Sequence, residues 1–297
     1  MCRWLAYSGS PILLEELLYK PEHSLIDQSM HAKLGVGTTN GDGFGVGWYT
    51  PGGRPEPTLF RGIGPAWGDD NLRELARSVE SGLFLAHIRA STGTAVQQSN
   101  CHPFRYGRWL WLHNGRIRGY QELKRSLVMA VDPDLYPHIG GSTDSELMFY
   151  LALTFGLERE PVGAVERMVA WIEDAGRHNG IEYPMQMTVA TTDGERLWAF
   201  RYSSEHSSRS LYCSTAIETL RLMYPDNPAL QTVSAQTRIV VSEPIGTLVG
   251  AWQPVAESSY ELVRPGVDVT GPFRPELPAT ADPERGAQLV AGQVTEL

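Results

Sequence analysis

Apolar stretches of strand length alternate with short polar segments over the first 264 residues, and strand-like stretches outnumber helical ones. Several strand-like stretches are apolar on both faces, which is typical of sheets buried between two layers. The predicted strands are 2–8, 44–49, 58–62, 83–90, 109–114, 185–192, 196–202, 210–214, 238–242 and 260–263, and the predicted helices are 11–19, 69–81, 120–131, 143–157 and 161–178. We expect an α+β fold in which sheets pack face to face with helices outside.

Turn residues indicate how some of these strands are connected. Asn114-Gly115 is a strong hairpin dipeptide and predicts a turn at the end of strand 109–114. Asp193-Gly194 predicts the first turn of an antiparallel meander made of the three strands that begin at residue 185.

No linker or internal repeat divides residues 1–264, so we expect them to form one domain. From Pro265 onward the chain is rich in Pro, Gly, Ala and charge and has no periodicity. Residues 265–297 are therefore predicted to be a loosely ordered C-terminal tail.

Composition excludes several classes of function. The net charge is −9, from 25 basic and 34 acidic residues, and no Lys/Arg cluster exceeds a pair, which disfavours nucleic-acid and membrane partners. Neither a transmembrane stretch nor a secretory signal is visible, so we expect a cytoplasmic protein that acts on a small molecule. Three widely spaced cysteines and scattered histidines match no metal spacing, and we expect neither a metal nor a cofactor.

The second residue of the chain is a cysteine, and its small side chain allows removal of the initiator methionine, which would leave Cys2 at the mature N-terminus. That residue would carry a thiol of ordinary pKa about 8.5 and an α-amine of about 7.7–8.0. The amine can take the proton of its own thiol, directly or through a water, so one residue can supply nucleophile and base. A small apolar role in the first strand is the alternative.

Two further segments carry groups that an amide-hydrolysing site needs. Arg89 ends an apolar strand and is followed by Thr92, and a guanidinium with a neighbouring hydroxyl can bind a carboxylate. The amide of Asn114 and the N–H of Gly115 are two donors that can converge on an oxyanion. The structural alternatives are a surface ion pair for Arg89 and a simple hairpin turn at Asn114-Gly115.

A third candidate is Asp144, within Thr143-Asp144-Ser145-Glu146, which has the form of a capping box at the start of a helix. The free N–H groups of a first helical turn keep a carboxylate ionised, so Asp144 can accept a substrate ammonium. Helix capping alone would also explain it. A glycine-rich stretch, 40–49, continues as a strand and matches neither a phosphate loop nor a dinucleotide fingerprint; its glycines allow close approach of another segment.

The order of these segments resembles the class II glutamine amidotransferases, which are N-terminal-nucleophile hydrolases, and in particular the stand-alone YafJ-type proteins. The residues that carry the resemblance are Met1-Cys2, Asp42-Gly43-Phe44-Gly45, Ala86-His87-Ile88-Arg89, His102-Pro103-Phe104, His113-Asn114-Gly115, Thr143-Asp144-Ser145-Glu146 and Val240-Val241-Ser242-Glu243-Pro244. The similarity covers about residues 1–263.

The resemblance implies a four-layer αββα sandwich of antiparallel sheets. It implies that Cys2 attacks the side-chain amide of glutamine or of a γ-glutamyl compound, forming a thioester that water resolves to glutamate. Arg89 and Thr92 would bind the α-carboxylate and Asp144 the α-ammonium. Asn114 and the Gly115 N–H would form the oxyanion hole.

Two departures from the family bear on function. Synthase-type members commonly carry Arg-Trp-Ala-Thr-His-Gly where this chain has Arg89-Ala90-Ser91-Thr92-Gly93, so the glutamine-covering loop is expected to differ. Synthases also append an ammonia-consuming domain, whereas only about thirty irregular residues follow residue 263 here. A separate ammonia-accepting protein, or simple hydrolysis, would fit this organisation.

Two alternatives to a glutaminase-type activity remain open. The hydrolase of ergothioneine biosynthesis, which acts on a γ-glutamyl-cysteinyl histidine-betaine intermediate, also begins Met-Cys-Arg and carries His-Asn-Gly. The other alternative is a non-catalytic module that binds an amino acid or regulates a partner.

Overall fold

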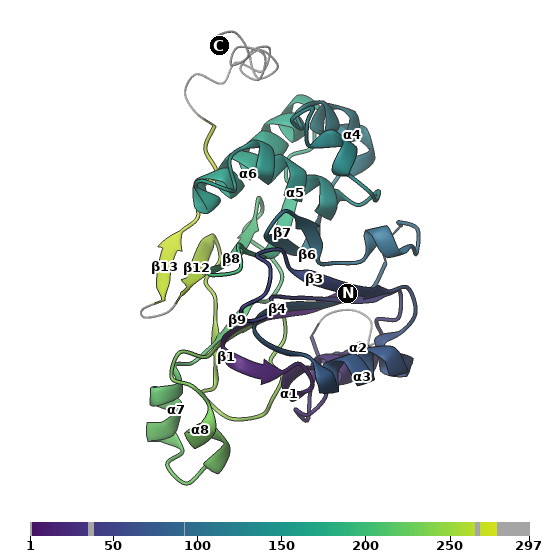
Figure 1. Cartoon of the computed structure of the whole chain (residues 1–297). Coiled ribbons are helices and arrows are strands. Elements are labelled where there is room, and N and C mark those ends of the chain that lie inside the picture. The colour runs from purple at the N-terminus through teal and green to yellow at the C-terminus, as the bar shows by residue number, and fades with distance from the viewer. Residues whose placement is uncertain (1, 35–38, 92, 265–267, 278–297) are drawn as a thin grey trace.

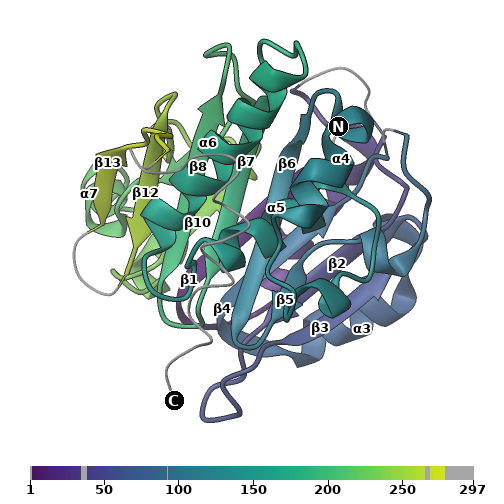
Figure 2. The same ribbon diagram turned by 90° about the horizontal axis from the view of Figure 1, so that it is seen from above.

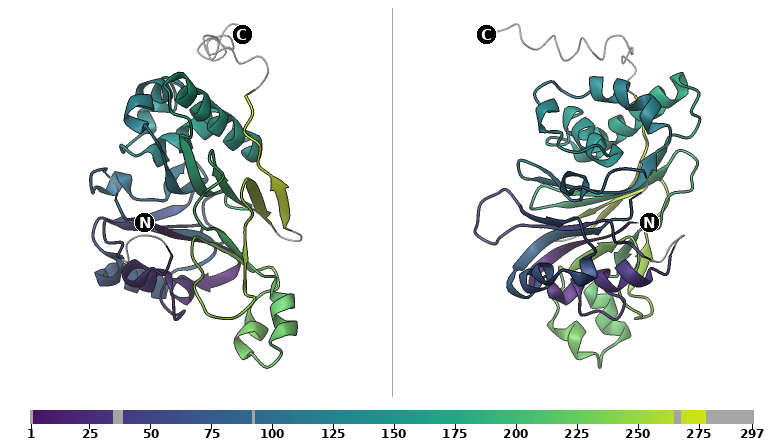
Figure 3. Two further views of the ribbon diagram at one scale, coloured as in Figure 1. Left: turned by 180° about the vertical axis from the view of Figure 1, so that it is seen from behind. Right: turned by 90° about the vertical axis from the view of Figure 1, so that its right-hand side faces the viewer.

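The computed structural model describes residues 2–34, 39–91, 93–264 and 268–277. Within these residues two antiparallel sheets stack on each other, with one group of helices above and another below (Figure 1). The predicted helix–sheet–sheet–helix order is confirmed. Figure 3 shows the same layers from behind and from the side.

The first sheet has the strand order β11-β9-β10-β1-β4-β2-β3. Helices α1, α2 and α3 cover its outer face (Figure 1). Its strands are β1 Arg3–Leu13, β2 Phe44–Trp48, β3 Thr58–Gly62, β4 Glu80–Ile88, β9 Tyr212–Ser214, β10 Arg238–Val241 and β11 Trp252–Pro254, and the helices are α1 Glu15–Leu18, α2 Leu25–His31 and α3 Asp70–Ser78.

The second sheet has the order β13-β12-β8-β7-β6-β5, and α4, α5 and α6 lie over it when viewed from above (Figure 2). Its strands are β5 Phe104–Tyr106, β6 Trp109–Ile117, β7 Met185–Thr192, β8 Leu197–Ser203, β12 Ser259–Val263 and β13 Val269–Pro272, and the helices are α4 Tyr120–Met129, α5 Asp144–Thr154 and α6 Pro161–His178. Two short helices, α7 Ile217–Met223 and α8 Pro228–Thr232, project beside the first sheet (Figure 1).

Side chains that alternate along each strand divide the core between the layers. In β1, Trp4 and Ala6 enter the cluster between the two sheets, whereas Leu5 and Tyr7 pack on the α1–α3 side. In β6, Leu110 and Leu112 face the space between the sheets. The tryptophans on either side of Leu110 pack under α4–α6 instead. Both faces of these strands are buried, which explains their continuous apolar sequences.

The predicted helix 11–19 is wrong over its first residues. β1 continues beyond a register shift, and Ile12 and Leu13 pair with Ser81 and Glu80 of β4. The helix that follows is the single turn α1. Pairing with a neighbouring strand far along the chain outweighs the local helical pattern here.

The predicted turn at Asn114-Gly115 is also wrong. β6 runs through this dipeptide to Ile117, and Gly115 pairs with Met187 of β7. Gly115 has φ +143°, and a Cβ there would lie 1.9 Å from the carbonyl oxygen of Gln186. The dipeptide therefore bends a continuing strand at a place that only glycine fits.

The predicted three-strand meander holds only for its first two strands. β7 and β8 pair as expected, but β9 pairs with β10 and β11 in the other sheet. The segment between β8 and β9 crosses from one sheet to the other, and Leu211 near its end is buried between them. Burial of that leucine in the shared core accounts for the crossing.

The structure also tests the expectations for the C-terminal segment and for the glycine-rich segment. Val269–Pro272, within the expected tail, forms β13 against β12, and Phe273 is buried in the core under α4–α6. In β2, the close approach expected of the glycines is confirmed, because a Cβ on Gly45 would lie 2.1 Å from the carbonyl oxygen of His102.

Candidate functional site

The alternation along three strands brings the predicted polar residues to one end of the space between the sheets. Cys2 lies two positions before Trp4, and Asn114 two positions after Leu112, so each continues the inward-facing series of its strand. Leu83 and Leu85 of β4 also face inward, which places His87 and Arg89 in the same series. At this end of the three strands, the last inward-facing positions are therefore polar, whereas the inward-facing positions before them are apolar.

Cys2 contacts both sheets. The N–H of Ala90 donates to its Sγ at 3.3 Å, and the thiol lies 3.5 Å from the carbonyl oxygen of Ala90. The side-chain amide of Asn114 donates to the Cys2 carbonyl oxygen at 2.9 Å. Burial raises the pKa of the Cys2 thiol, and the hydrogen bond from Ala90 acts against this rise. The structure therefore brings together Cys2, Asn114 and the residue next to Arg89.

Arg89 is only 4% exposed. Its guanidinium donates to the carbonyl oxygen of Asp42 at 3.1 Å and to the hydroxyls of Thr94 and Ser91 at 2.6 and 3.2 Å. Thr92, the predicted helper, lies outside the described residues. The two hydroxyls that meet Arg89 belong to the same Ser-Thr-Gly-Thr run, which was the available signal for them.

The glycine-rich segment before β2 fixes the strand end that carries Arg89. The carboxylate of Asp42 accepts from the N–H of Ser91 at 2.7 Å, and the N–H of Asp42 donates to the carbonyl oxygen of Arg89 at 3.1 Å. The N–H of Arg89 donates to the carbonyl oxygen of Gly43 at 2.8 Å. Asp42 is thus a positioning residue for Arg89 that reasoning from the sequence left without a role.

Asp144 begins α5, and the side chain of Thr143 accepts from the N–H of Glu146 as the capping pattern predicts. The Asp144 carboxylate accepts from the N–H of Ile117 at 2.8 Å and from the N–H of Ser145 at 2.8 Å. It contacts the end of β6 rather than Cys2 directly. Oδ1 also accepts from the Ser145 hydroxyl at 3.3 Å, whereas Oδ2 accepts only from Ile117 among the described residues and therefore keeps acceptor capacity.

A buried ionic network next to Cys2 was missed from the sequence. Arg3 and Glu243 form an ion pair with an Nε–Oε2 distance of 2.8 Å and are each 2% exposed. The same carboxylate accepts from the N–H groups of Lys33 and Leu34 at 2.8 and 3.0 Å and contacts the ring of His23 at 2.5 Å. Burial favours a higher pKa for Glu243, but these hydrogen bonds outweigh it and the pKa is lowered.

This network reaches the nucleophile candidate directly. Arg3 Nη1 donates to the Cys2 carbonyl oxygen at 3.0 Å, the same oxygen that receives the amide of Asn114. Glu243 lies 240 positions from Arg3 in the chain. Ser-Glu-Pro at 242–244 was visible as a family-like motif, but nothing local linked it to residue 3.

Two histidine rings in contact, tilted by 33° to each other, complete the buried polar end. The rings of His87 and His102 have centroids 4.2 Å apart, and none of their four nitrogens has a hydrogen-bond partner among the described residues. Burial lowers the pKa of His87 to about 3 and places the pKa of His102 well below its ordinary value. Both rings are therefore neutral at neutral pH.

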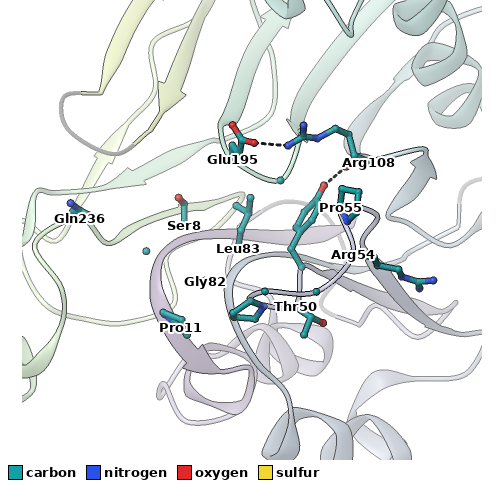
Figure 4. Close-up of a pocket in the computed structure, with 16 residues that line it drawn as sticks. Ser8, Pro11, Thr50, Arg54, Pro55, Gly82, Leu83, Arg108, Glu195 and Gln236 are labelled. Carbon is teal, nitrogen blue, oxygen red and sulfur yellow. Dashed lines mark hydrogen bonds and ion pairs between the residues drawn. The ribbon is translucent and has the colours of Figure 1, made fainter.

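The opposite end of the sandwich contains an open cavity of about 570 Å³, shown in Figure 4. It lies beside Ser8 of β1 and Leu83 of β4, which pair with each other, whereas Arg3 and Ile88 pair at the Cys2 end. The Arg108–Glu195 ion pair of 2.9 Å is part of its wall. At about 3.3 Å per strand residue, this cavity is roughly 20 Å from Cys2.

Neither a metal site nor a membrane segment is found within the part of the chain that the structure describes. It contains no group of three or more His, Cys, Asp or Glu side chains arranged to hold a metal ion. It likewise contains no helix of the length and apolarity needed to cross a membrane.

Comparison with known proteins assigns the family. Residues 22–253 match the model of the class-II glutamine amidotransferases. The chain is 33% identical over 299 residues to the probable glutamine amidotransferase DUG3 of Saccharomyces cerevisiae, covering 89% of this chain and 82% of that protein. It is 29% identical over 200 residues to the gamma-glutamyl-hercynylcysteine sulfoxide hydrolase of Mycolicibacterium smegmatis, covering 66% and 81%.

Solved structures agree with this assignment. A glutamine aminotransferase class-II domain protein from Silicibacter pomeroyi superposes with a TM-score of 0.71 at 34% identity, covering 93% of this chain and all of that one. Glutamine phosphoribosylpyrophosphate amidotransferase from B. subtilis has the same fold, with a TM-score of 0.59 at 14% identity, covering 93% and 50%. The chain belongs to the class II glutamine amidotransferase family and is an enzyme of that class.

Proposed function

We propose that this protein hydrolyses the γ-amide of glutamine or of a γ-glutamyl compound, with Cys2 as the nucleophile. The observation that carries the proposal is the meeting of Cys2 with Asn114 and with the Arg89 strand end, three chain segments that are remote in sequence. Removal of Met1 would free the α-amine of Cys2. That amine takes the thiol proton, which offsets the raised thiol pKa caused by burial.

The proposed reaction has two steps at the γ-carbon. Cys2 Sγ forms a bond to the amide carbon, the C–N bond breaks, and the departing nitrogen receives the proton held by the α-amine. Water then attacks the thioester, giving its proton to the same amine, and glutamate leaves with the thiol regenerated. The amide of Asn114 and the N–H of Gly115 donate to the oxyanion in each step.

The other predicted residues bind the amino-acid end of the substrate. Arg89 pairs with the α-carboxylate, and its burial makes that contact strong because little water competes for the guanidinium. Asp144 accepts from the α-ammonium with the remaining lone pair of Oδ2. Thr92 is proposed to assist Arg89 through its hydroxyl.

The test is glutamate release by purified protein whose mature terminus has been determined by mass spectrometry. Cys2→Ala should abolish release from glutamine and from γ-glutamyl amides, whereas Cys213→Ala, which removes a thiol from β9, should retain it. Unchanged turnover in Cys2→Ala would overturn the mechanism. A retained Met1 together with binding but no turnover would favour a non-catalytic amino-acid-binding module.

A second candidate is a hydrolase that acts on γ-glutamyl-hercynylcysteine sulfoxide. The similarity to the Mycolicibacterium smegmatis enzyme favours it, as does the shared Met-Cys-Arg start. Parallel assays with glutamine and with that sulfoxide separate the two. If ammonia is the product, a separate acceptor protein is proposed to use it, and the cytoplasmic location stays a prediction.

A further inference from the structure

The oxygen end of the Asn114 carboxamide has no hydrogen-bond partner among the described residues. Its Nδ2 donates to the Cys2 carbonyl oxygen at 2.9 Å, whereas Oδ1 is buried and accepts no hydrogen bond from them. A carboxamide has two N–H donors, so the second one remains for the oxyanion of the proposed reaction. The unpaired oxygen costs free energy and leaves one end of the proposed oxyanion-hole group unfixed.

The ring of His87 is a second buried polar group without a partner in the described part of the chain. His87 is 1% exposed, and neither of its nitrogens forms a hydrogen bond there. It follows Leu85 in the inward-facing series of β4, as Asn114 follows Leu112 in that of β6. These two strands contact each other across the space between the sheets. Two unpaired groups of complementary chemistry therefore enter the same end of that space.

The pKa of the His87 ring agrees with an interaction between these two groups. Burial lowers the pKa of His87 to about 3, and hydrogen bonding with the side chain of Asn114 acts against this decrease. A hydrogen bond that raises the pKa of an imidazole is one in which the ring donates, so the acceptor is Oδ1 of Asn114. The two side chains are not aligned for a bond of full geometry, and rotation about a side-chain bond completes it.

Packing restricts the position of the His87 ring. The ring of His102 lies against it, with centroids 4.2 Å apart. The backbone of His102 also approaches Gly45 of β2, which stands opposite His87 in the pairing of β2 with β4. On the other side of β4, His87 pairs with Trp4 of β1, two positions after Cys2. The ring N–H is therefore a donor held in place beside the proposed nucleophile.

His87 is unsuited to act as the base for the thiol. With a pKa of about 3, the ring cannot retain a proton taken from Cys2 at neutral pH. The thiol instead hydrogen-bonds to the backbone of Ala90. A neutral imidazole keeps one N–H, which is all that donation to Oδ1 of Asn114 requires. The role that fits His87 is therefore one that acts through Asn114.

We propose that His87 is a positioning residue for the oxyanion hole: its ring N–H donates to Oδ1 of Asn114 and keeps Nδ2 turned toward the oxyanion. The inference rests on the proposed function. With one end of the planar carboxamide held by the Cys2 carbonyl oxygen and the other by His87, the group cannot turn over and present its oxygen to the developing negative charge. A donor oriented in advance stabilises the transition state without reorganising during the reaction.

The experiment measures kcat and KM for glutamate release by His87 variants, with glutamine or another γ-glutamyl amide that the wild type hydrolyses. His87→Phe keeps a flat ring but has no donor, and kcat should fall by about 10- to 100-fold. KM should stay within about threefold, because the lost interaction acts on the transition state. His87→Gln and His87→Asn place a carboxamide N–H₂ near Nε2 and Nδ1, respectively, and the better of the two should have a higher kcat than His87→Phe.

The loss should disappear once Asn114 is truncated. In the Asn114→Ala background, His87→Phe should change kcat by less than about threefold, because no carboxamide remains to be oriented. Ser81→Ala is the matched control. Ser81 lies on the same strand as His87, is 0% exposed, and its hydroxyl donates to the carbonyl oxygens of Tyr49 and Leu83, each at 2.8 Å. This change should leave kcat and KM within about twofold in both backgrounds.

The outcomes separate this inference from the proposed function. Unchanged kcat in His87→Phe, or equal losses of kcat with and without the Asn114 carboxamide, would overturn the positioning role while Cys2-dependent glutamate release stands. A rise in KM without a fall in kcat would also overturn it, because a distorted β4 would displace Arg89 instead. Absence of Cys2-dependent release from every substrate would overturn both. Turnover is referred to folded protein measured by circular dichroism, and His87→Leu is a second donor-free variant.

Discussion

The two ends of the space between the sheets differ in what fills them. At the Cys2 end, the interior closes with buried Arg3, Arg89 and Asn114, none of them more than 4% exposed. At the other end, near Ser8 and Leu83, the sheets open onto a cavity of about 570 Å³ (Figure 4). The cavity is the more conspicuous feature, yet the residues of the proposed reaction lie at the buried polar end.

The difference shows why concavity alone is a poor guide in this fold. Burying charged and amide groups costs free energy unless partners compensate them, so a cluster of such groups indicates a purpose beyond packing. The cavity end has an ordinary surface ion pair and residues of turns. Three predictions test this contrast between the two ends.

The largest expected effect is on stability at the Cys2 end. Glu243→Gln leaves Arg3 buried without its counter-charge, and we expect the free energy of unfolding at pH 7 to fall by about 3–5 kcal/mol. Hydrogen bonds lower the pKa of Glu243 below its ordinary 4.5, so its contribution is full above that pH and is lost as the pH falls through the lowered value. Denaturant unfolding at pH 7 and at pH 4 measures both effects.

The difference in the free energy of unfolding between wild type and Glu243→Gln should be smaller at pH 4 than at pH 7. A matched change at the cavity end, Glu195→Gln, removes an exposed ion pair and should cost less than about 1 kcal/mol. Equal losses at the two ends would refute the contrast between them.

The second effect is on turnover. Asn114→Ala should lower kcat by about 100- to 1000-fold, because one of the two donors of the proposed oxyanion hole is lost. Tyr49→Phe is the control at the cavity end, where the hydroxyl donates to the carbonyl oxygen of Arg108 at 2.6 Å. It should leave kcat within about twofold. A comparable loss of kcat in both variants would assign the chemistry to the cavity instead.

The third effect is a pH dependence of the stability that comes from the buried pair His87 and His102. His87, with its pKa lowered to about 3, stays neutral in the folded protein but takes a proton when unfolded below about pH 6.5. Because only the unfolded state takes up this proton, the free energy of unfolding does not depend on this group above pH 6.5 and falls by about 1.4 kcal/mol per pH unit as the pH drops from 6.5 toward 3. His102 acts in the same direction.

Denaturant unfolding between pH 7.5 and 4.5 tests this slope. His87→Gln should make the decline shallower, whatever its effect at pH 7.5, whereas replacing the exposed His178 by Gln should leave the slope unchanged. A wild-type slope that survives in His87→Gln would show that this ring is not the group responsible.

Much of the architecture could be predicted from the sequence. The alternation of apolar residues located most strands, and Pro161–His178 was found at both ends as a helix. Cys2, Arg89 and Asn114 were selected because each ends or begins an apolar series with a polar group of suitable chemistry. These features are local. The spacing of apolar residues, the capping residues of helices and the residue types themselves reveal them within a few positions of the chain.

Other features depend on contacts between remote segments. Asn114-Gly115 read as a turn because its neighbours in sequence favour one, but β7 lies alongside and keeps the strand extended. The strand 212–214 changed sheets because burial of Leu211 and pairing with β10 decided its place.

The sequence alone thus determined which residues have reactive or ion-binding groups. It also determined in which stretches apolar and polar residues alternate. Only the tertiary structure decided that Glu243 meets Arg3 beside Cys2. The physical reason is that compensation of a buried or crowded charge depends on every segment packed around it. Neighbours along the chain specify only a small part of those surroundings.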